Sequence, residues 1–515
     1  MKRIYFALLL MILVSFAGCN EDFLDRNPLD QISSATFWKT QQDADMALTA
    51  CYAALDRRHP HPWGEDEWLY EWGCGQMSWM TPVWDCLTDN ASDNWEDGFG
   101  FREAGKGIIE ANLWDPFVTH EAFYIRYVNI ATCNTFIDNI DDVDMDEDEI
   151  DVYKAQAMFL RAYCYFSLSE LYGGVPLVLH APTPEEAKMA KSPKSEIVAQ
   201  VIKDLDFAIS NLPDETYSGK AVKGSALALK ARVQLYSGNW PEAASLCQQV
   251  MNSGFSLSSS FTSNFIAWEQ DDNPEIIFSI EYLGPSLFHF MDVHQGQWQN
   301  IAPLQNLVDE FECTDGLPID ESPGFDPENP YDDRDPRLRM TVAVYGDPDP
   351  LSENGIFDED DRPDDITTEF LYKKYLTPES GWDDYGVSEQ DVVLMRYADV
   401  LLMYAEAQNE ASGPDGTVYD AVNEVRDRVD MPELPAGLSQ SEMRDRIRHE
   451  RRVELAFEGT RYFDLKRWGI LLEVCNQITD PTSDEPRNLQ EHHYLWPFPQ
   501  EEMDINPSLV QNPGY

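Results

Sequence analysis

Positively charged residues are scarce in this chain. Its 515 residues include 37 lysines and arginines against 93 aspartates and glutamates, which gives a net charge of −56 at pH 7. A surface this acidic repels phosphate backbones and anionic lipid head groups, so the charge argues against nucleic-acid binding. Polyanionic ligands are disfavoured for the same reason, and neutral ligands are easier to accommodate.

The sequence also lacks an apolar run long enough to cross a membrane as a helix, which takes about 20 residues. The apolar run at residues 4–16 is shorter and follows Lys2 and Arg3, as in a secretory signal peptide. It ends in Phe16-Ala17-Gly18-Cys19, which resembles a bacterial lipobox with phenylalanine in place of the usual leucine. We therefore predict a lipoprotein signal peptide at residues 1–18, a lipid anchor on Cys19 and a tether at 19–35. The alternative is an ordinary signal peptide with an incidental cysteine.

Catalytic and metal-binding motifs are missing as well. No CxxC pair is present, so a zinc site built from cysteines is not expected. Residues 100–107 imitate a phosphate loop, but Gly107 stands where serine or threonine would hold magnesium. There is no G-x-S-x-G motif. We predict that the chain is not an enzyme and has neither catalytic residues nor a cofactor.

An acidic run at residues 141–151 lacks the glycine and the final acid of an EF-hand loop. It is interpreted as a solvated turn between two helices, with weak calcium binding as the alternative. Eight cysteines follow Cys19. Those at 51, 133, 164 and 247 fall on helical patterns and are expected to be small buried residues, whereas Cys74 and Cys86 share a loop and are the best disulfide candidates.

Apolar residues recur at helical spacing through much of the chain and predict a mainly α fold. The expected helices cover residues 44–55, 117–140, 152–172, 197–212, 221–236, 242–251, 392–411, 418–429 and 441–458. Ala231, Gly238, Trp240 and Ala243 fall where a tetratricopeptide repeat places its small and aromatic residues. We expect a repeat scaffold of paired helices with long loop-rich insertions and few short strands.

Two segments interrupt this helical pattern. Residues 59–101 hold six of the 14 tryptophans. Residues 255–390 are rich in proline, glycine, aspartate and aromatic residues, with short apolar runs such as 276–280 that favour strands. The predicted organisation is an N-terminal helical part at 36–254 that carries the aromatic loop 59–101, a loop-rich insertion at 255–390, and a C-terminal helical part at 391–515. The two helical parts are expected to pack as one domain.

Flat aromatic rings cover the apolar faces of sugar rings, while aspartate, asparagine and glutamine bond the hydroxyl groups. Residues 84–95 and 288–300 carry this mixture. The alternative is that most of the rings pack the loops onto the helices. The mixed charges of residues 448–468 are interpreted as internal ion pairs that fix helix ends.

Ordered motifs along the whole chain resemble the SusD/RagB family of nutrient-uptake lipoproteins. They are Phe23-Leu24-Asp25 after Cys19, Phe37-Trp38, Thr88-Asp89-Asn90-Ala91, residues 157–163 and 171–177, Asp315-Gly316, Asp335-Pro336-Arg337-Leu338, residues 396–402, the block 450–468, residues 495–499 and Asn506-Pro507.

The resemblance implies four tetratricopeptide-like units that support a loop-rich face, a source in the phylum Bacteroidota, and anchoring to the outer surface of the outer membrane. It also implies a SusC-like TonB-dependent transporter as partner and an oligosaccharide or polysaccharide as ligand. A peptide-binding uptake lipoprotein of the same fold is the alternative, and a helical glycoside hydrolase is a third, less favoured hypothesis. Family members contact sugars from loops that correspond to about 72–101 and 284–300 here. The ligand-binding residues chosen from these loops are Trp72, Trp79, Trp84, Asp89, Asn90, Trp95, Phe288 and Trp298.

Overall fold

The computed structural model describes residues 37–56, 81–94, 100–112, 122–183, 185–284, 288–289, 291–293, 300–348, 356–357, 367–376 and 388–515. The described part is mainly helical, and its few strands form two-stranded pairs. The predicted fold class is confirmed. Cys19 and the tether lie outside the described residues.

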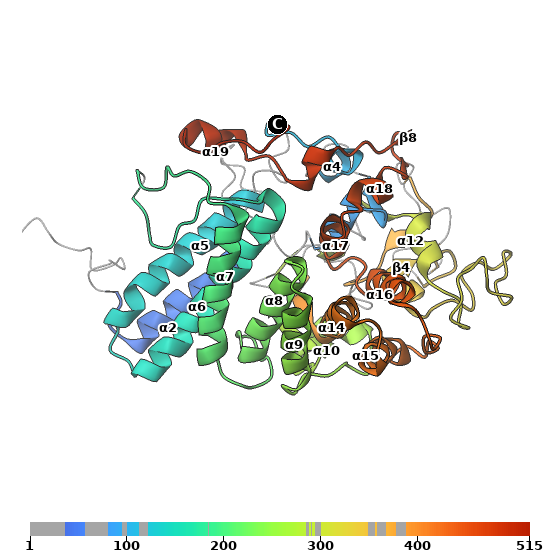
Figure 1. Ribbon diagram of the computed structural model, residues 1–515, viewed down its shortest axis with the longest axis horizontal. Helices are drawn as coiled ribbons and strands as arrows, with labels where there is room; N and C mark the ends of the chain where they lie inside the picture. The colour runs from blue at the N-terminus through green and yellow to red at the C-terminus, as the bar shows by residue number, and fades with distance from the viewer. Residues whose placement is uncertain are drawn as a thin grey trace, which may run out of the picture.

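The N-terminal half is a row of helices in which each packs on the next along the chain (Figure 1). These helices are α2 (Gln41–Ala53), α5 (Ala122–Asn139), α6 (Glu147–Tyr172), α7 (Lys194–Asn211), α8 (Lys223–Tyr236) and α9 (Trp240–Met251). Between α8 and α9 the chain turns at Gly238, whose φ of +71° suits glycine. Ala231 and Ala243 are fully buried and let the two helices approach closely, as the repeat pattern predicts.

The C-terminal half continues the row, because α9 packs on α14 (Tyr397–Ser412), which in turn packs on α15 (Gly416–Asp427) and α16 (Gln440–Glu454). Asp415 caps α15 by accepting a hydrogen bond from the backbone N–H of Thr417 at 2.9 Å. Three shorter helices follow: α17 (Arg461–Arg467), α18 (Leu471–Cys475) and α19 (Gln500–Ile505).

The loop-rich insertion contains short elements. Its helices are α10 (Ala267–Gln270), α11 (Met291–Val293), α12 (Gln305–Glu310) and α13 (Arg337–Thr341). The strand expected at 276–280 is confirmed as β2 (Ile276–Ile280), which pairs antiparallel with β6 (Val392–Arg396). The helix expected at 392–411 was wrong in its first five residues, because the largely buried run Val392–Arg396 forms β6 and the helix begins at Tyr397. The β-branched residues of this run suit an extended strand.

The remaining strands are also short and paired: β1 (Ala91–Asp93) with β3 (Ile301–Pro303), β4 (Val342–Ala343) with β5 (Leu371–Tyr372), and β7 (Thr479–Asp480) with β8 (Glu485–Pro486). The other helical pieces are η2 (Ala54–Asp56), η3 (Pro82–Leu87), α4 (Phe101–Lys106), η5 (Ile140–Asp142), η6 (Thr262–Asn264) and η10 (Glu491–Tyr494).

The acidic run between α5 and α6 is a helix connection, as predicted. Asp146 caps α6 by accepting from the N–H of Asp148 at 3.0 Å, and Asp141 forms an exposed ion pair with Lys154 at 2.6 Å. Weak calcium binding there stays a prediction.

The cysteines expected to be buried on helices, Cys51, Cys133, Cys164 and Cys247, are buried free thiols. The proposed disulfide between Cys74 and Cys86 is wrong. Cys86 is a free thiol within η3, and burial raises its pKa well above the ordinary value. Cys74 lies outside the described residues.

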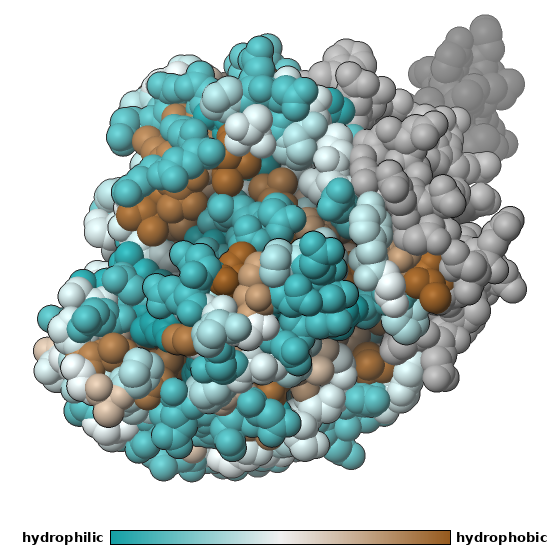
Figure 2. All heavy atoms as spheres, turned by 90° about the vertical axis from the view of Figure 1, so that its right-hand side faces the viewer, coloured by the Kyte–Doolittle hydropathy of each residue, from teal (hydrophilic) through white to brown (hydrophobic). Residues whose placement is uncertain are grey.

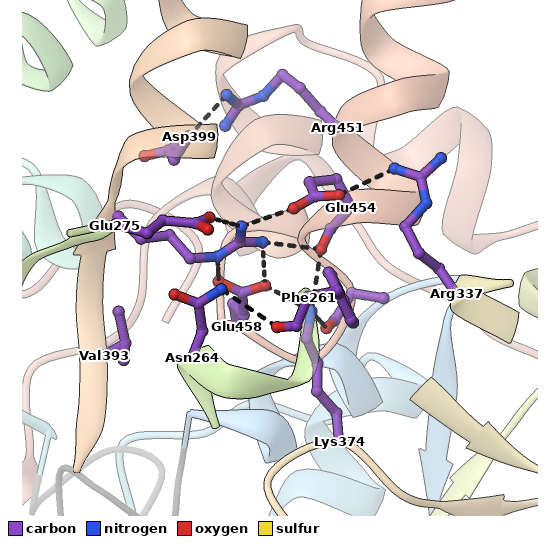
Figure 3. A network of polar contacts seen from close by, with 12 residues as sticks. Phe261, Asn264, Glu275, Arg337, Lys374, Val393, Asp399, Arg451, Glu454 and Glu458 are labelled. Atoms are coloured by element: carbon purple, nitrogen blue, oxygen red, sulfur yellow. Dashed lines mark hydrogen bonds and ion pairs between the residues drawn. The ribbon is translucent and has the colours of Figure 1, made fainter. Parts of the chain in front are cut away.

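Buried ion pairs join the C-terminal half, as the mixed charge of the sequence predicts. Arg396, at the end of β6, is 1 % exposed in its side chain and donates to Glu275, Glu454 and Glu458 at 2.6–2.7 Å (Figure 3). Arg337 on α13 reaches Glu454 at 2.9 Å from the other side. Burial alone would raise the pKa of Glu454, but its arginine partners hold that pKa well below the usual range.

The same network of ion pairs extends to α15 and to the segment that follows α12. Arg337 also bonds Glu450 on α16 at 2.6 Å, and Glu450 accepts from Arg426 on α15 at 2.8 Å. Arg426 in turn reaches Glu312, just after α12, at 3.0 Å. We call Glu275, Glu312, Arg337, Arg396, Arg426, Glu450, Glu454 and Glu458 the ionic core. Many of the few arginines therefore lie inside the protein. The face drawn in Figure 2 is largely hydrophilic, with hydrophobic atoms in separate patches.

Replacing Arg396 by methionine removes the cation that bonds all three of these buried carboxylates; Glu275 and Glu454 keep Arg428, and Glu458 keeps Lys374. We expect Arg396→Met to lower the free energy of unfolding by about 3–5 kcal/mol in a urea titration, since breaking a buried ion pair from one side costs that much. The control is Lys223→Met, which removes a cation paired at 3.2 Å with the exposed Asp214 and should change stability by about 0–1 kcal/mol. Equal stability of both variants would contradict the assignment of Arg396 to a coupled buried network.

Candidate ligand-binding face

The ribbon formed by β1 and β3 brings two distant loops together. Asp93 pairs with Ile301, and beyond this pair the N–H of Asn94 donates to the carbonyl oxygen of Asn300 at 2.8 Å. One predicted ligand loop continues after Asn94, and the other ends at Asn300. The described residues that flank the two loops are therefore hydrogen-bonded neighbours, although they are about 200 positions apart in the chain.

Other segments attach polar groups to this ribbon or to the second predicted ligand loop. The hydroxyl of Thr367 donates to the side-chain oxygen of Asn94 at 2.6 Å, and β3 also contacts β5. His289 and Ser388 exchange two backbone hydrogen bonds at 2.9 and 3.1 Å, and the Ser388 hydroxyl donates to Asp292 at 2.8 Å. Amide, hydroxyl and carboxylate groups from four stretches of chain thus lie at the edge of the loops.

Arginines from the C-terminal half fix the base of this face. The carboxylate of Asp89 accepts two hydrogen bonds from Arg461 at 3.0 Å and lies 2.9 Å from Arg452. Burial alone would raise the pKa of Asp89, but these two guanidinium groups lower it to about 2. Asn90 accepts from Arg452 at 2.8 Å and donates to Asp85 at 2.6 Å. The start of the first loop is therefore held by charge-assisted hydrogen bonds.

Comparison with known proteins gives matches over nearly the whole chain. The model of the SusD family matches residues 268–515, and a second model, described as starch-binding and associating with the outer membrane, matches residues 88–235. The SusD-like protein P2 of Formosa agariphila is 28 % identical over 98 % of each chain. The chain belongs to the SusD/RagB family.

Solved structures agree with this assignment. A SusD-like carbohydrate-binding protein of Bacteroides fragilis superposes with a TM-score of 0.80 at 28 % identity, covering 92 % of this chain and all of that one. A laminarin-binding SusD-like protein shares the fold at 22 % identity, with a TM-score of 0.72 and coverage of 93 % and 100 %. SusD-family proteins bind their ligands without catalysis, so this chain is not an enzyme. None of the helices in the described ranges is long and apolar enough to cross a membrane.

The predicted ligand residues of this SusD/RagB protein fall into four groups. Asp89 and Asn90 are 3 % and 0 % exposed, so the structure places them in the base of the face, and their contact with a ligand stays a prediction. Trp84 is 7 % exposed and packs its ring against Tyr462 and Trp496, which makes it mainly a core residue.

Phe288 is half-buried next to His289, at the edge of the second loop. The other four ligand-binding residues predicted from the sequence, Trp72, Trp79, Trp95 and Trp298, lie outside the described residues, and their contact with a ligand stays a prediction.

Sequence reasoning missed the arginines that support the loop. The block at 448–468 was interpreted as structural ion pairs, which is confirmed, but nothing in its pattern indicated Asp89 as a partner of Arg452 and Arg461. No local sequence pattern indicates a role for Arg487, although it is 2 % exposed and donates to the carbonyl oxygens of Thr88 and Ala91.

The depressed pKa of Asp89 predicts a pH-dependent stability. Its ion pairs contribute fully above the unfolded pKa of about 3.9, and the contribution is lost as the pH falls through about 2. We expect Asp89→Asn to be less stable than the parent protein at pH 7, and the difference to shrink by about 2 kcal/mol between pH 5 and pH 2 in urea titrations.

The control for this measurement is Asp214→Asn, at an exposed position, where a small difference should remain nearly constant with pH. A difference between Asp89→Asn and the parent that does not change with pH would contradict the proposed ion pairs of Asp89.

Proposed function

We propose that this SusD/RagB protein binds oligosaccharide or polysaccharide at the cell surface, does not cut it, and passes it to a SusC-like TonB-dependent transporter in the outer membrane. The observation that carries the proposal is the β1–β3 ribbon, which joins the bases of two loops rich in aromatic and amide residues. The fold relative from Bacteroides fragilis is described as carbohydrate-binding, which supports the same ligand class.

The chemistry of the two loops suits a neutral sugar. Trp95 follows Asn94 directly in the chain, and Trp298 stands two positions before Asn300. Indole rings cover the CH faces of pyranose rings, while amide and hydroxyl groups such as those of the half-buried Asn94 and Thr367 suit the hydroxyl rim. The strongly acidic composition disfavours a polyanionic chain as ligand.

Delivery to a transporter rests on the family assignment and on the predicted lipid anchor. A protein anchored through Cys19 to the outer membrane would stay beside a barrel in the same membrane, and the ligand would be held between the two. We expect the transporter to co-purify with this protein from outer membranes solubilised in mild detergent.

Trp95→Ala and Trp298→Ala should each weaken polysaccharide binding about tenfold, since a stacked aromatic ring contributes on the order of 1 kcal/mol or more. Binding is measured by pull-down with insoluble polysaccharides and by calorimetry with a panel of neutral oligosaccharides. Trp268→Ala is the matched control, because Trp268 is a tryptophan on α10 that is 57 % exposed and lies outside both loops.

Unchanged binding in both loop variants, with loss in Trp268→Ala, would place the ligand elsewhere. Parent protein that binds peptides in a parallel panel but no glycan would favour the peptide-uptake function and contradict the proposal.

A further inference from the structure

A pocket of about 100 Å³ opens where α5, α6 and α8 meet the loop before α17. Its walls include the rings of Trp84, Tyr163 and Phe463. Tyr163 and Phe463 are half-buried, so the pocket is open to solvent at its rim. The β1–β3 ribbon supplies none of its lining residues, although Thr81 and Trp84 come from the segment that leads into this ribbon.

Arg126 lines this pocket from α5 with most of its hydrogen-bonding capacity unused. It is 7 % exposed, its Nη1 donates to the carbonyl oxygen of Ala122 at 2.7 Å, and its buried Nε has no partner. A buried polar atom without a partner costs on the order of 1–3 kcal/mol. Such a cost in a folded protein calls for an explanation, and a bound ligand provides one.

Arg126 differs from the other buried arginines of the described chain. All of those except Arg334 have a carboxylate within 4.0 Å, and Arg334 donates to the carbonyl oxygens of three residues. In a chain with 93 acidic residues, a buried guanidinium without a carboxylate is exceptional.

The other charged groups that line the pocket are already paired. Glu458 bonds Lys374 and Arg396, Arg232 lies 2.8 Å from Asp399, and Glu170 lies 2.8 Å from Lys194. Among the described lining residues, Arg126 is thus the charged group without a counter-ion, and the pocket presents a positive charge between aromatic walls.

We propose that this pocket binds a small carboxylate carried on a ring, the chemistry of a single uronic acid. A guanidinium with free donors recognises a carboxylate through charge-assisted hydrogen bonds, and the rings of Tyr163 and Phe463 suit the flat body behind it. The pocket is too small for a polymer chain, so it admits one terminal residue or a free acid. The proposal does not depend on neutral glycan binding at the ribbon.

Titration of the purified protein with glucuronic acid, glucose and acetate, followed by NMR or calorimetry, tests the proposal. Glucuronic acid should bind and glucose should not bind at this pocket. If acetate binds as tightly as glucuronic acid, the pocket is a general carboxylate site and the ring contributes nothing. If acetate binds more weakly, the ring contributes to binding, as expected for a uronic acid site. No binding of either acid would overturn the proposal.

Variants assign any binding to this pocket. Arg126→Gln should lower the affinity for glucuronic acid at least tenfold, because a hydrogen bond between charged groups contributes about 1.5 kcal/mol or more. The control is Arg444→Gln. It removes the same charge from an ion pair between Arg444 on α16 and Glu410 on α14, outside the pocket, and should leave the affinity for glucuronic acid unchanged. Ser167→Leu, at a half-buried lining position on α6, fills the pocket while keeping Arg126 and should also abolish binding. Full affinity in either Arg126→Gln or Ser167→Leu would overturn the proposal.

Discussion

The buried contact between Arg396 and the carboxylates of Glu275, Glu454 and Glu458 is the constraint on which the C-terminal half of this protein depends. It joins β6, the residue before β2 and the end of α16, three elements that are far apart in the chain. Removing such charges from water is expensive, and well-packed apolar residues would often give equal or greater stability. We therefore attribute the ionic core to geometry: directional hydrogen bonds fix how short elements of the loop-rich insertion sit on the helical scaffold.

This geometry extends to the ligand-binding face through neighbouring arginines of the same block. Arg451 on α16 pairs with Asp399 and Asp464, while the next residue, Arg452, turns to Asp89 and Asn90 beneath the first loop. A loop that carries several aromatic residues needs a rigid base if its rings are to be held open to a ligand. The helical pairs supply that rigidity, and the arginines transmit it to the β1–β3 ribbon. Because most of the buried arginines are paired with buried carboxylates, the strongly negative net charge of the chain stays on its surface, which suits a neutral ligand.

Periodic features of the fold were predictable from sequence, and long-range ones were not. Helices such as α7 and α9 follow from apolar spacing, and the pairing of α8 with α9 follows from Ala231, Gly238 and Ala243. Residues 392–396 were mistaken for helix because a short buried strand and a buried helical turn have the same apolar composition. Asp89 and Asn90 resembled sugar-binding residues in type, but their partner Arg452 lies more than 360 positions away, and no local pattern encodes that contact. No sequence pattern indicates that the buried Nε of Arg126 has no hydrogen-bond partner, because this depends on side chains from several helices.

We propose that a fixed scaffold presents two neighbouring loops that bind a neutral glycan. Hydrogen exchange measured with and without a saturating soluble oligosaccharide, chosen as the best binder in a neutral panel, tests this most directly. We expect peptides that cover residues 91–100 and 288–303 to gain protection together, while those from α7, α8 and α9 do not change. Protection that appears on the helical pairs, or on one of the two segments without the other, would contradict it.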